Sequence, residues 1–447
     1  MLKRLSVWGI CFFFVSVTFG VKNNVIYARP HELPKAPGWE YGHVDKITWF
    51  QNVGSHEYEN ETVKVPDKYE NQKVLNSWGY KARPFEEIKD LLPEAWYNVF
   101  IHPEKWGHFR INETEYVPNT GRIYKMYLEA TEKNKGTCSL DKDGWLHNYK
   151  AGCPFPELDA NDPMIGYKIF WNYNKRLQFN SRQAPANCSV AIDRNHNVRN
   201  VFMDSRFLRY NGRFGGKNGA PLYEPNPKNL DVVWVQPYKA PYNLRGILPL
   251  IYRYDDPGKD DNMWIYLPSI RRVRRMAASQ TQDRLSGGLD MTWDNTEHFS
   301  GKTRKVKIHF EGETEVLMPL AASNEVMADS KGWLAGNDQY YQRRKCYKIR
   351  GEYKKPILMK DMTLWIDKET YMCCYSVDKD LKGRDWLGQM WFFSWYENGT
   401  FTSPNFIGID FQRNHSSPTC LASQINNLDW KTEMFSMEYL KRNLLAR

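Results

Sequence analysis

The amino-acid sequence predicts a mainly β protein of the α+β class, with an antiparallel sheet curved into a barrel or half-barrel. Short apolar segments separated by turn residues follow one another from residue 188 onward, whereas few segments have helical periodicity. In addition, two neighbouring segments, 244–254 and 263–267, are apolar on both faces. A curved sheet accounts for this, because one face packs on protein while the other lines a cavity.

The first residues have the plan of a secretory signal peptide. Lys3 and Arg4 precede an almost wholly apolar run over 5–20, and the small residues Gly20 and Ala28 suit a cleavage site. We therefore predict a signal peptide within residues 1–28, cleaved after Gly20 or Ala28, and an exported protein. An uncleaved membrane anchor is the alternative.

The charge of the chain narrows the classes of partner. The 447 residues carry a formal net charge of +10. On an exported protein this charge points away from nucleic acid and toward anionic lipid, an envelope polymer or an acidic partner. A plain solubility surplus explains the same excess equally well.

Residues 29–150 are rich in Pro, Tyr and Trp and show little periodicity apart from a short charged helical piece at 84–92. We expect an irregular N-terminal extension there. The motif Ala-Gly-Cys-Pro-Phe-Pro at 151–156 marks a boundary. The main domain is expected to span residues 151–447.

The main domain is predicted to begin with a helix over 163–177, because Met164, Tyr167 and Phe170 recur at helical spacing. Strands dominate beyond residue 188, and the polar stretch 277–300 is expected to be a loop or lid. Residues 303–310 alternate between apolar and polar side chains, as in a strand with one wet face. The other predicted strands are 189–192, 201–210, 231–236, 346–353, 362–367, 371–377 and 389–396, with a terminal helix in 428–445 that starts near Asp429.

Segments 244–254 and 263–267 form the predicted hairpin, with Asp-Asp-Pro-Gly at 255–258 as its turn. We expect the cavity to be lined by side chains of this hairpin and of the doubly apolar segment 389–396. The candidate ligand-binding residues are Leu250, Tyr252, Trp264, Tyr266, Trp391 and Phe393. Arg271 and Arg272, which follow the hairpin, are expected to hold an anionic head group at the cavity mouth. The alternative is a set of surface salt bridges with Asp255, Asp260 and Asp261.

The sequence contains no recognisable catalytic constellation. There is no Gly-x-Ser-x-Gly elbow, no phosphate-binding loop and no Cys-x-x-Cys or His-x-x-x-His pair. We therefore predict neither a metal nor a cofactor. Cys138 and Cys153 bracket a loop and are the preferred disulfide pair, whereas Cys373 and Cys374 point to opposite faces of one strand.

Three motifs in and after the hairpin resemble the signature of the family called domain of unknown function 1329. They are Asp-Asp-Pro at 255–257, Trp-Ile-Tyr-Leu-Pro at 264–268 and Arg-Arg-Val-Arg-Arg at 271–275. Residues 151–156 and 290–294 add to the resemblance, which covers roughly residues 150–420. The resemblance implies a lipoprotein-carrier-like half-barrel with a helical lid around an apolar cavity, in the periplasm or outer membrane of a Gram-negative bacterium. Such proteins are often encoded beside envelope exporters, and no binding residues come with the family.

These observations predict a non-enzymatic carrier or binding protein for a lipid, an acylated protein or another hydrophobic compound. Peripheral membrane contact and partnership with an envelope exporter fit this prediction. Two alternatives stay open. One is an envelope enzyme acting on polysaccharide, which requires two close carboxylates in an aromatic cleft. The other is a structural adaptor of an exporter or outer-membrane assembly.

Overall fold

The computed structural model describes residues 47–51, 62–63, 78–79, 83–114, 125–178, 180–213, 223–320, 334–395, 401–421, 425–426 and 430–444. The predicted signal peptide lies outside these residues. Within the described ranges, no helix has the length and apolar character needed to cross a membrane.

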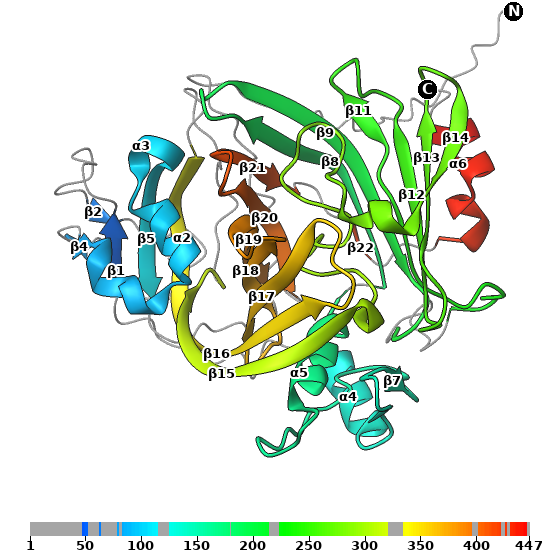
Figure 1. Cartoon of the computed structure of the whole chain (residues 1–447), viewed down its shortest axis with the longest axis horizontal. Coiled ribbons are helices and arrows are strands. Elements are labelled where there is room, and N and C mark those ends of the chain that lie inside the picture. Colours follow the sequence, from blue (N-terminus) through cyan, green and yellow to red (C-terminus); the bar gives the residue numbers. More distant parts are fainter. Residues whose placement is uncertain are drawn as a thin grey trace, which may run out of the picture.

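One large curved sheet dominates the molecule, with a few helices around it (Figure 1). Its main strands are β8 (Ser181–Ile192), β9 (Val198–Arg209), β10 (Leu230–Val235), β11 (Tyr238–Ala240), β12 (Leu248–Tyr254), β13 (Asn262–Leu267), β14 (Arg272–Met276), β15 (Val306–Met318), β16 (Leu334–Tyr353), β17 (Met359–Asp367), β18 (Cys373–Asp380), β19 (Asp385–Trp395), β20 (Phe401–Asp410) and β21 (His415–Cys420). The predicted mainly β class is therefore confirmed.

The strands pair antiparallel in the order β14–β13–β12–β10–β9–β8–β21–β20–β19–β18–β17–β16–β15. Most neighbours in this order are also neighbours in sequence. The pairing of β8 with β21 joins strands that are more than 200 residues apart in the chain, and it connects the run β8–β14 to the run β15–β21. This long-range pairing makes one continuous sheet of the two runs.

The predicted hairpin is present as β12 and β13, with Leu250 opposite Trp264. The arginine-rich residues after it form the third strand, β14, which pairs with β13. Strands β20 and β21 and the first half of β16 were not predicted. Their sequences contain Pro404, Asn405 and Pro418, or a run of polar residues, which are typical of turns when read without their neighbours.

Residues 83–114 contain regular structure that packs on the sheet. The elements are β4 (Arg83–Pro84), the 3-10 helix η2 (Phe85–Leu91), α2 (Glu94–Phe100), α3 (Pro103–Trp106) and β5 (Gly107–Thr114). β5 pairs parallel with the first half of β16, and β1 (Ile47–Gln51) pairs antiparallel with β5. Trp96 of α2 is fully buried and its indole Nε1 donates to the Ser376 carbonyl at 3.2 Å. The proposed domain division at residue 150 stays a prediction. The short strands β2 (Thr62–Val63) and β3 (Trp78–Gly79) pair with each other.

The segment before β8 contributes the helices α4 (Lys125–Asn134) and α5 (Ile165–Asn174) and a small hairpin, β6 (Ser139–Leu140) with β7 (Leu146–His147). α5 confirms the helix predicted over 163–177. Its side chains Ile169, Phe170 and Tyr173 are fully buried in a core shared with β15, β16 and β17. This packing fixes the C-terminal end of α5 beside the concave side of the sheet (Figure 1).

The C-terminal segment covers one face of the β12–β13 hairpin. After β22 (Ile425–Asn426), the chain forms the 3-10 helix η5 (Thr432–Phe435) and α6 (Met437–Leu444). Phe435 and Leu440 are buried against β10 and β12, and the Tyr252 hydroxyl donates to the Phe435 carbonyl at 2.8 Å. The terminal helix thus begins at Met437, whereas Asp429 lies outside the described residues.

Residues 277–305, which we call the inner segment, cross the concave side of the sheet. They contain two short 3-10 helices, η3 (Ala278–Gln282) and η4 (Thr303–Lys305), and otherwise turns. The inner segment touches both runs of strands. Arg253 of β12 donates to the Trp293 carbonyl at 3.0 Å, and the Asp290 carboxylate accepts from Ser417 of β21 at 2.6 Å.

Candidate functional site

A cavity of about 160 Å³ lies between the concave face of β8, β9, β10 and β12, the end of α5 and the inner segment. Its apolar lining includes Trp145, Trp171, Phe207, Trp234, Leu285, Met291, Phe299, Trp391, Phe406 and Leu421. Its charged lining comprises Lys175, Arg176, Arg182, Arg209, Asp231, Arg253, Asp255, Asp261, Glu297 and Lys302. The cavity is therefore both aromatic and strongly charged.

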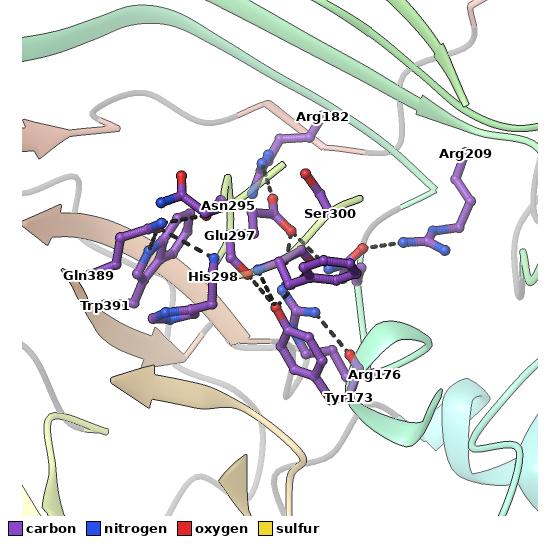
Figure 2. Close-up of polar contacts among 12 residues, drawn as sticks. Tyr173, Arg176, Arg182, Arg209, Asn295, Glu297, His298, Ser300, Gln389 and Trp391 are labelled. Carbon is purple, nitrogen blue, oxygen red and sulfur yellow. Dashed lines mark hydrogen bonds and ion pairs between the residues drawn. The ribbon is translucent and has the colours of Figure 1, made fainter. Parts of the chain in front are cut away.

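Three guanidinium groups gather around a single carboxylate in this cavity. The Glu297 carboxylate accepts from Arg176 at 3.1 Å and from Arg182 at 3.0 Å (Figure 2). Arg209 donates to the side-chain carbonyl of Gln178, and Gln178 in turn donates to Glu297 at 3.1 Å. Among the described residues, no carboxylate forms an ion pair with Arg209. We call Arg176, Arg182 and Arg209 the arginine cluster.

The arginine cluster keeps Glu297 ionised. Burial by itself raises the pKa of this carboxyl, but the charges and hydrogen bonds of Arg182 and Arg176 outweigh burial and lower the pKa below its ordinary value. One negative charge therefore faces three positive charges. The cluster carries an excess of positive charge at the edge of an aromatic cavity.

The backbone of the inner segment is bent sharply to place Glu297 there. Glu297 and His298 both have left-handed backbone conformations, with φ of 54° and 72°. Such conformations cost on the order of 1 kcal/mol each for residues other than glycine. The Tyr173 hydroxyl holds the bend, because it donates to the Glu297 carbonyl and accepts from the Phe299 N–H at 3.2 Å.

His298 lies beneath this bend and is neutral. Its Nδ1 is 2.9 Å from the Ser376 hydroxyl, and burial lowers the pKa of the imidazole well below its ordinary range. Its ring packs near Trp391, whose indole N–H donates to Gln389 at 2.9 Å (Figure 2). These contacts hold Trp391, which lines the cavity, and the neutral His298 adds no charge there.

A second group of charges lines the part of the cavity formed by β10 and β12. Lys175 contacts both carboxylate oxygens of Asp231 at 3.0 and 3.1 Å. Arg253 and Lys302 share Asp261 at 2.8 and 3.3 Å. The positive charges are thus largely matched in this second group, unlike in the arginine cluster.

Asp231 and Asp255 have pKa values shifted in opposite directions. Burial raises the pKa of Asp231, but the positive charges of Lys175 and Arg209 outweigh it, so the net shift is downward. The pKa of Asp255 is raised because the surrounding protein displaces water from its carboxyl group, and because the negative charge of Asp231 is close. An ionised and a more readily protonated carboxyl therefore line the same aromatic cavity.

Four of the predicted ligand-binding residues share one face of the hairpin. Leu250 and Tyr252 are buried against Phe435 and Leu440 of the C-terminal segment, and Trp264 and Tyr266 pack on the same cluster. The cavity lies on the opposite face, to which Arg253 points. The part of these four residues in ligand binding stays a prediction.

The other predicted residues are dispersed. Trp391 lines the cavity and stacks on Phe406, with ring centroids 4.6 Å apart and planes at 10°. Phe393 is buried in the main core. Arg271 and Arg272 are exposed and have no ion pair with any described residue, while Asp260 pairs with Arg304. Their contact with a head group also stays a prediction.

Cys138 and Cys153 are free thiols, so the preferred disulfide between them is not present. Over the part of the chain that the structure describes, no group of three or more His, Cys, Asp or Glu side chains is arranged to hold a metal ion.

The residues of the arginine cluster were not predicted from the sequence. Arg176 follows α5, Arg182 and Arg209 lie in β8 and β9, and Glu297 lies in the inner segment. The available signal was weak: Arg182 and Arg209 occupy inward-facing positions of strands that otherwise read as ordinary sheet. Only the pairing of the strands brings them together.

A family model described as "Protein of unknown function (DUF1329)" matches residues 82–445. The match extends further toward the N-terminus than the motifs seen in the sequence. A search of curated proteins found no match.

Three solved structures resemble the chain at low identity. They are a provisionally described outer membrane lipoprotein-sorting protein domain from Vibrio parahaemolyticus (12% identity, TM-score 0.46, 62% of this chain and 98% of that chain), a DUF1329 family protein from Desulfovibrio piger (15%, 0.46, 62% and 97%) and a LolA superfamily protein from Nitrosomonas europaea (12%, 0.39, 60% and 95%).

Proposed function

The chain belongs to the DUF1329 family of proteins of unknown function, and we propose that it is a non-enzymatic carrier or binding protein for a hydrophobic or amphiphilic compound of the bacterial envelope. The cavity on the concave side of the sheet carries this proposal. Its walls combine tryptophan and phenylalanine rings with many charged side chains, so the cavity offers both apolar surface and polar groups that can orient a ligand.

The size of the cavity limits what it holds as it stands. A dry protein cavity of about 150 Å³ accommodates one benzene ring, and this cavity measures about 160 Å³. A single ring system or a short alkyl segment fits that volume. A complete acyl chain or an acylated protein requires the inner segment to move away from the sheet.

The proposal includes export to the periplasm or outer membrane of a Gram-negative bacterium. The signal-peptide-like plan of residues 1–28 supports it, and so does the basic net charge, which suits peripheral contact with anionic lipid. Delivery of the compound to or from an envelope exporter is the step that such a carrier would serve.

The proposal is tested with a substitution that fills the cavity with a side chain. Ser205 lines it, and Ser205→Phe places a ring in the space where a ligand would lie. Ser269→Phe adds the same ring at an exposed turn and is the matched control. Binding of benzyl alcohol is measured by calorimetry, and organic extracts of the native protein are analysed by mass spectrometry.

We expect wild type and Ser269→Phe to bind the neutral probe and to release a co-purified apolar compound, whereas Ser205→Phe does neither. Equal results in all three proteins contradict the proposal, and so does a wild type that neither binds a probe nor releases a co-purified compound. Circular dichroism establishes that both variants remain folded.

One observation favours an enzyme acting on polysaccharide as a second candidate. Asp231 and Asp255, whose pKa values are shifted apart, line a cavity that contains four tryptophans. An ionised base and a protonated acid are what glycosidic hydrolysis requires. Against this, Lys175 occupies the Asp231 carboxylate in a bidentate contact.

The two candidates are separated by activity. Wild type that releases reducing ends from envelope polysaccharide, with the release lost in both Asp231→Asn and Asp255→Asn, would favour the enzyme function over the carrier function. We expect no release from any of the three proteins.

A further inference from the structure

We propose that the cavity selects an anionic amphiphile, whose carboxylate, sulfonate or phosphate group binds Arg182 and Arg209. This inference rests on the proposed function and specifies the class of its ligand. In this inference, Arg182 and Arg209 inside the cavity recognise the anionic group, in place of the exposed Arg271 and Arg272.

The charge imbalance of the cavity carries the inference. Six cationic side chains and four carboxylates line it. Glu297 contacts Arg176 and Arg182, but Arg209, which is 6% exposed, donates to the Gln178 amide and to no carboxylate among the described residues. Burying a cation without a matching anion is unfavourable. An anion entering the cavity supplies the missing charge.

Side chains on three neighbouring strands form a row from the charged to the apolar end of the cavity. Arg182 of β8 lies opposite Phe207 of β9, and Phe207 lies opposite Trp234 of β10. The guanidinium carbons of Arg182 and Arg209 are 5.8 and 5.6 Å from the centre of the Phe207 ring. An amphiphile thus finds cations at one end of this row and an indole at the other.

Glu297 already occupies the position of an anion in the cluster. Its carboxylate engages two guanidinium groups, and left-handed backbone at Glu297 and His298 holds it there. A bound anion therefore competes with Glu297 for Arg182 and gains Arg209 in addition. Removing the Glu297 charge should strengthen anion binding, whereas removing that of Arg209 should weaken it.

The experiment compares benzoate with benzyl alcohol, which share the benzene ring and differ in charge. Calorimetric titrations use the full chain as wild type, Arg209→Gln, Glu297→Gln and the control Arg271→Gln, whose side chain is exposed outside the cavity. We expect wild type to prefer the carboxylate by about tenfold or more, the effect of one charge-assisted hydrogen bond. Arg209→Gln should remove this preference, Glu297→Gln should increase it, and Arg271→Gln should leave it unchanged.

Equal binding of the two probes, or an unchanged preference in both Arg209→Gln and Glu297→Gln, overturns the inference. Neither result contradicts the proposed carrier function. Failure of wild type to bind either probe, when no compound co-purifies with it either, overturns the proposed function as well. If Arg209→Gln does not fold, Glu297→Gln still tests the inference, because misfolding cannot produce the increased preference for the carboxylate that we expect of this variant.

Two further experiments distinguish a free anionic amphiphile from a lipid head group. Wild type is offered decanoate in solution, or vesicles containing phosphatidylglycerol, and bound material is identified by mass spectrometry. Capture of decanoate alone supports a free anionic amphiphile, and extraction of phosphatidylglycerol supports a lipid head group. Capture of neither, by a protein that binds no benzoate, contradicts the inference.

A separate observation leads us to infer a disulfide between Cys188 and Cys420 in an oxidising compartment. The two residues are directly opposite each other in the antiparallel pair of β8 and β21. The adjacent pair, Ser189 and Thr419, has its hydroxyl oxygens 2.8 Å apart on one face of the sheet, so both cysteine side chains lie on the other face. Facing residues have Cα atoms about 4.5–5.5 Å apart, within the range that a disulfide spans.

The reaction is a thiol–disulfide exchange with an oxidised dithiol. The Cys420 thiolate attacks the oxidant's disulfide and releases one thiol. Cys188 then attacks the Cys420 sulfur and releases the second thiol, so that two electrons and two protons pass to the oxidant. Cys420 is the better first nucleophile because Cys188 is buried, and burial raises the pKa of the Cys188 thiol to about 12.

Wild type is incubated with oxidised glutathione, unfolded without reductant, alkylated with iodoacetamide and digested. We expect a cross-linked peptide pair containing Cys188 and Cys420, while Cys346 is alkylated. Complete alkylation of both residues overturns the inference. Cys188→Ser is the control, and it should remove the cross-link and leave Cys420 alkylated or bound to glutathione.

Discussion

Buried polar side chains determine where the inner segment lies against the sheet. The Asp290 carboxylate accepts from Arg284, Ser417 and His415, the last two at 2.6 Å. The buried Asp378 carboxylate, in contrast, has one hydrogen-bond partner among the described residues, the Asn295 amide at 2.7 Å. Burial therefore raises the pKa of Asp378 to about 7, so its protonated form is favoured in the folded protein.

Asp378 makes stability depend on pH. In the unfolded chain its carboxyl titrates near the ordinary value of 3.8, whereas the folded protein holds the proton up to about pH 7. Its favourable contribution is complete below pH 4 and is lost as the pH rises through about 7. Asp378→Asn should remove this loss and stabilise the protein at pH 8 by on the order of 1–3 kcal/mol.

Urea unfolding of wild type and Asp378→Asn at pH 5 and pH 8 measures the effect. The exposed Asp283→Asn is the control and should leave the pH dependence unchanged. Identical pH slopes for wild type and Asp378→Asn would show that the carboxyl is not buried as described.

The Arg344–Asp367 pair provides a second prediction at this scale. Arg344 donates to both Asp367 oxygens at 2.9 and 3.1 Å, and both side chains are 1% exposed. Asp367→Asn removes the negative charge that Arg344 contacts through both oxygens, although the contact with Glu369 stays, and should destabilise the protein by about 3 kcal/mol. Asp385→Asn breaks the more exposed pair with Lys379 and should cost less than about 1 kcal/mol. Chemical denaturation compares the two, and equal losses would contradict the prediction.

At the scale of elements, the β12–β13 hairpin has two apolar faces, and each face has a different cover. Leu250 and Tyr252 face the C-terminal segment, whereas Ile251 and Met263 face a core that includes Leu285 of the inner segment. The alternation along the strands shows which side chains share a face. It does not show which face the cavity adjoins, because that depends on where residues 277–305 and 430–444 pack.

The position of Tyr252 is tested by two variants. Tyr252→Phe keeps the ring and removes its hydrogen bond to the Phe435 carbonyl, and should cost about 1 kcal/mol. Phe435→Ala should cost about 3–4 kcal/mol because it opens a cavity in this core. Neither should change the affinity for benzyl alcohol in calorimetry. A several-fold weaker affinity in Tyr252→Phe would instead support the assignment made from the sequence.

At the scale of the whole molecule, residues 83–114 and the main sheet share one core. The Trp96 ring lies 6.0 Å from that of Tyr375 and 5.9 Å from that of Phe411, and β5 continues the sheet beside β16. A parallel pairing between segments more than 200 residues apart leaves no local signature in the sequence.

Trp96→Ala should therefore destabilise the entire protein by about 3–5 kcal/mol. Scanning calorimetry of the full chain should show one unfolding transition, shifted to lower temperature. Leu381→Ala, which truncates an exposed side chain, is the control and should leave that transition in place. A second, separate transition in Trp96→Ala would indicate that the N-terminal residues form a domain of their own.

Local patterns in the sequence were sufficient for the β class, the helix at 163–177, the hairpin and the resemblance to the DUF1329 family, because periodicity and turn residues act over a few positions. The arginine cluster, the cover of each hairpin face and the pairings β5–β16 and β8–β21 were decided by tertiary structure. Arg176, Arg182, Arg209 and Glu297 are ordinary surface-type residues when read in sequence, and they line one cavity only because distant segments pack together. Alternation thus specifies which side chains lie together on a face, and long-range packing specifies what that face meets.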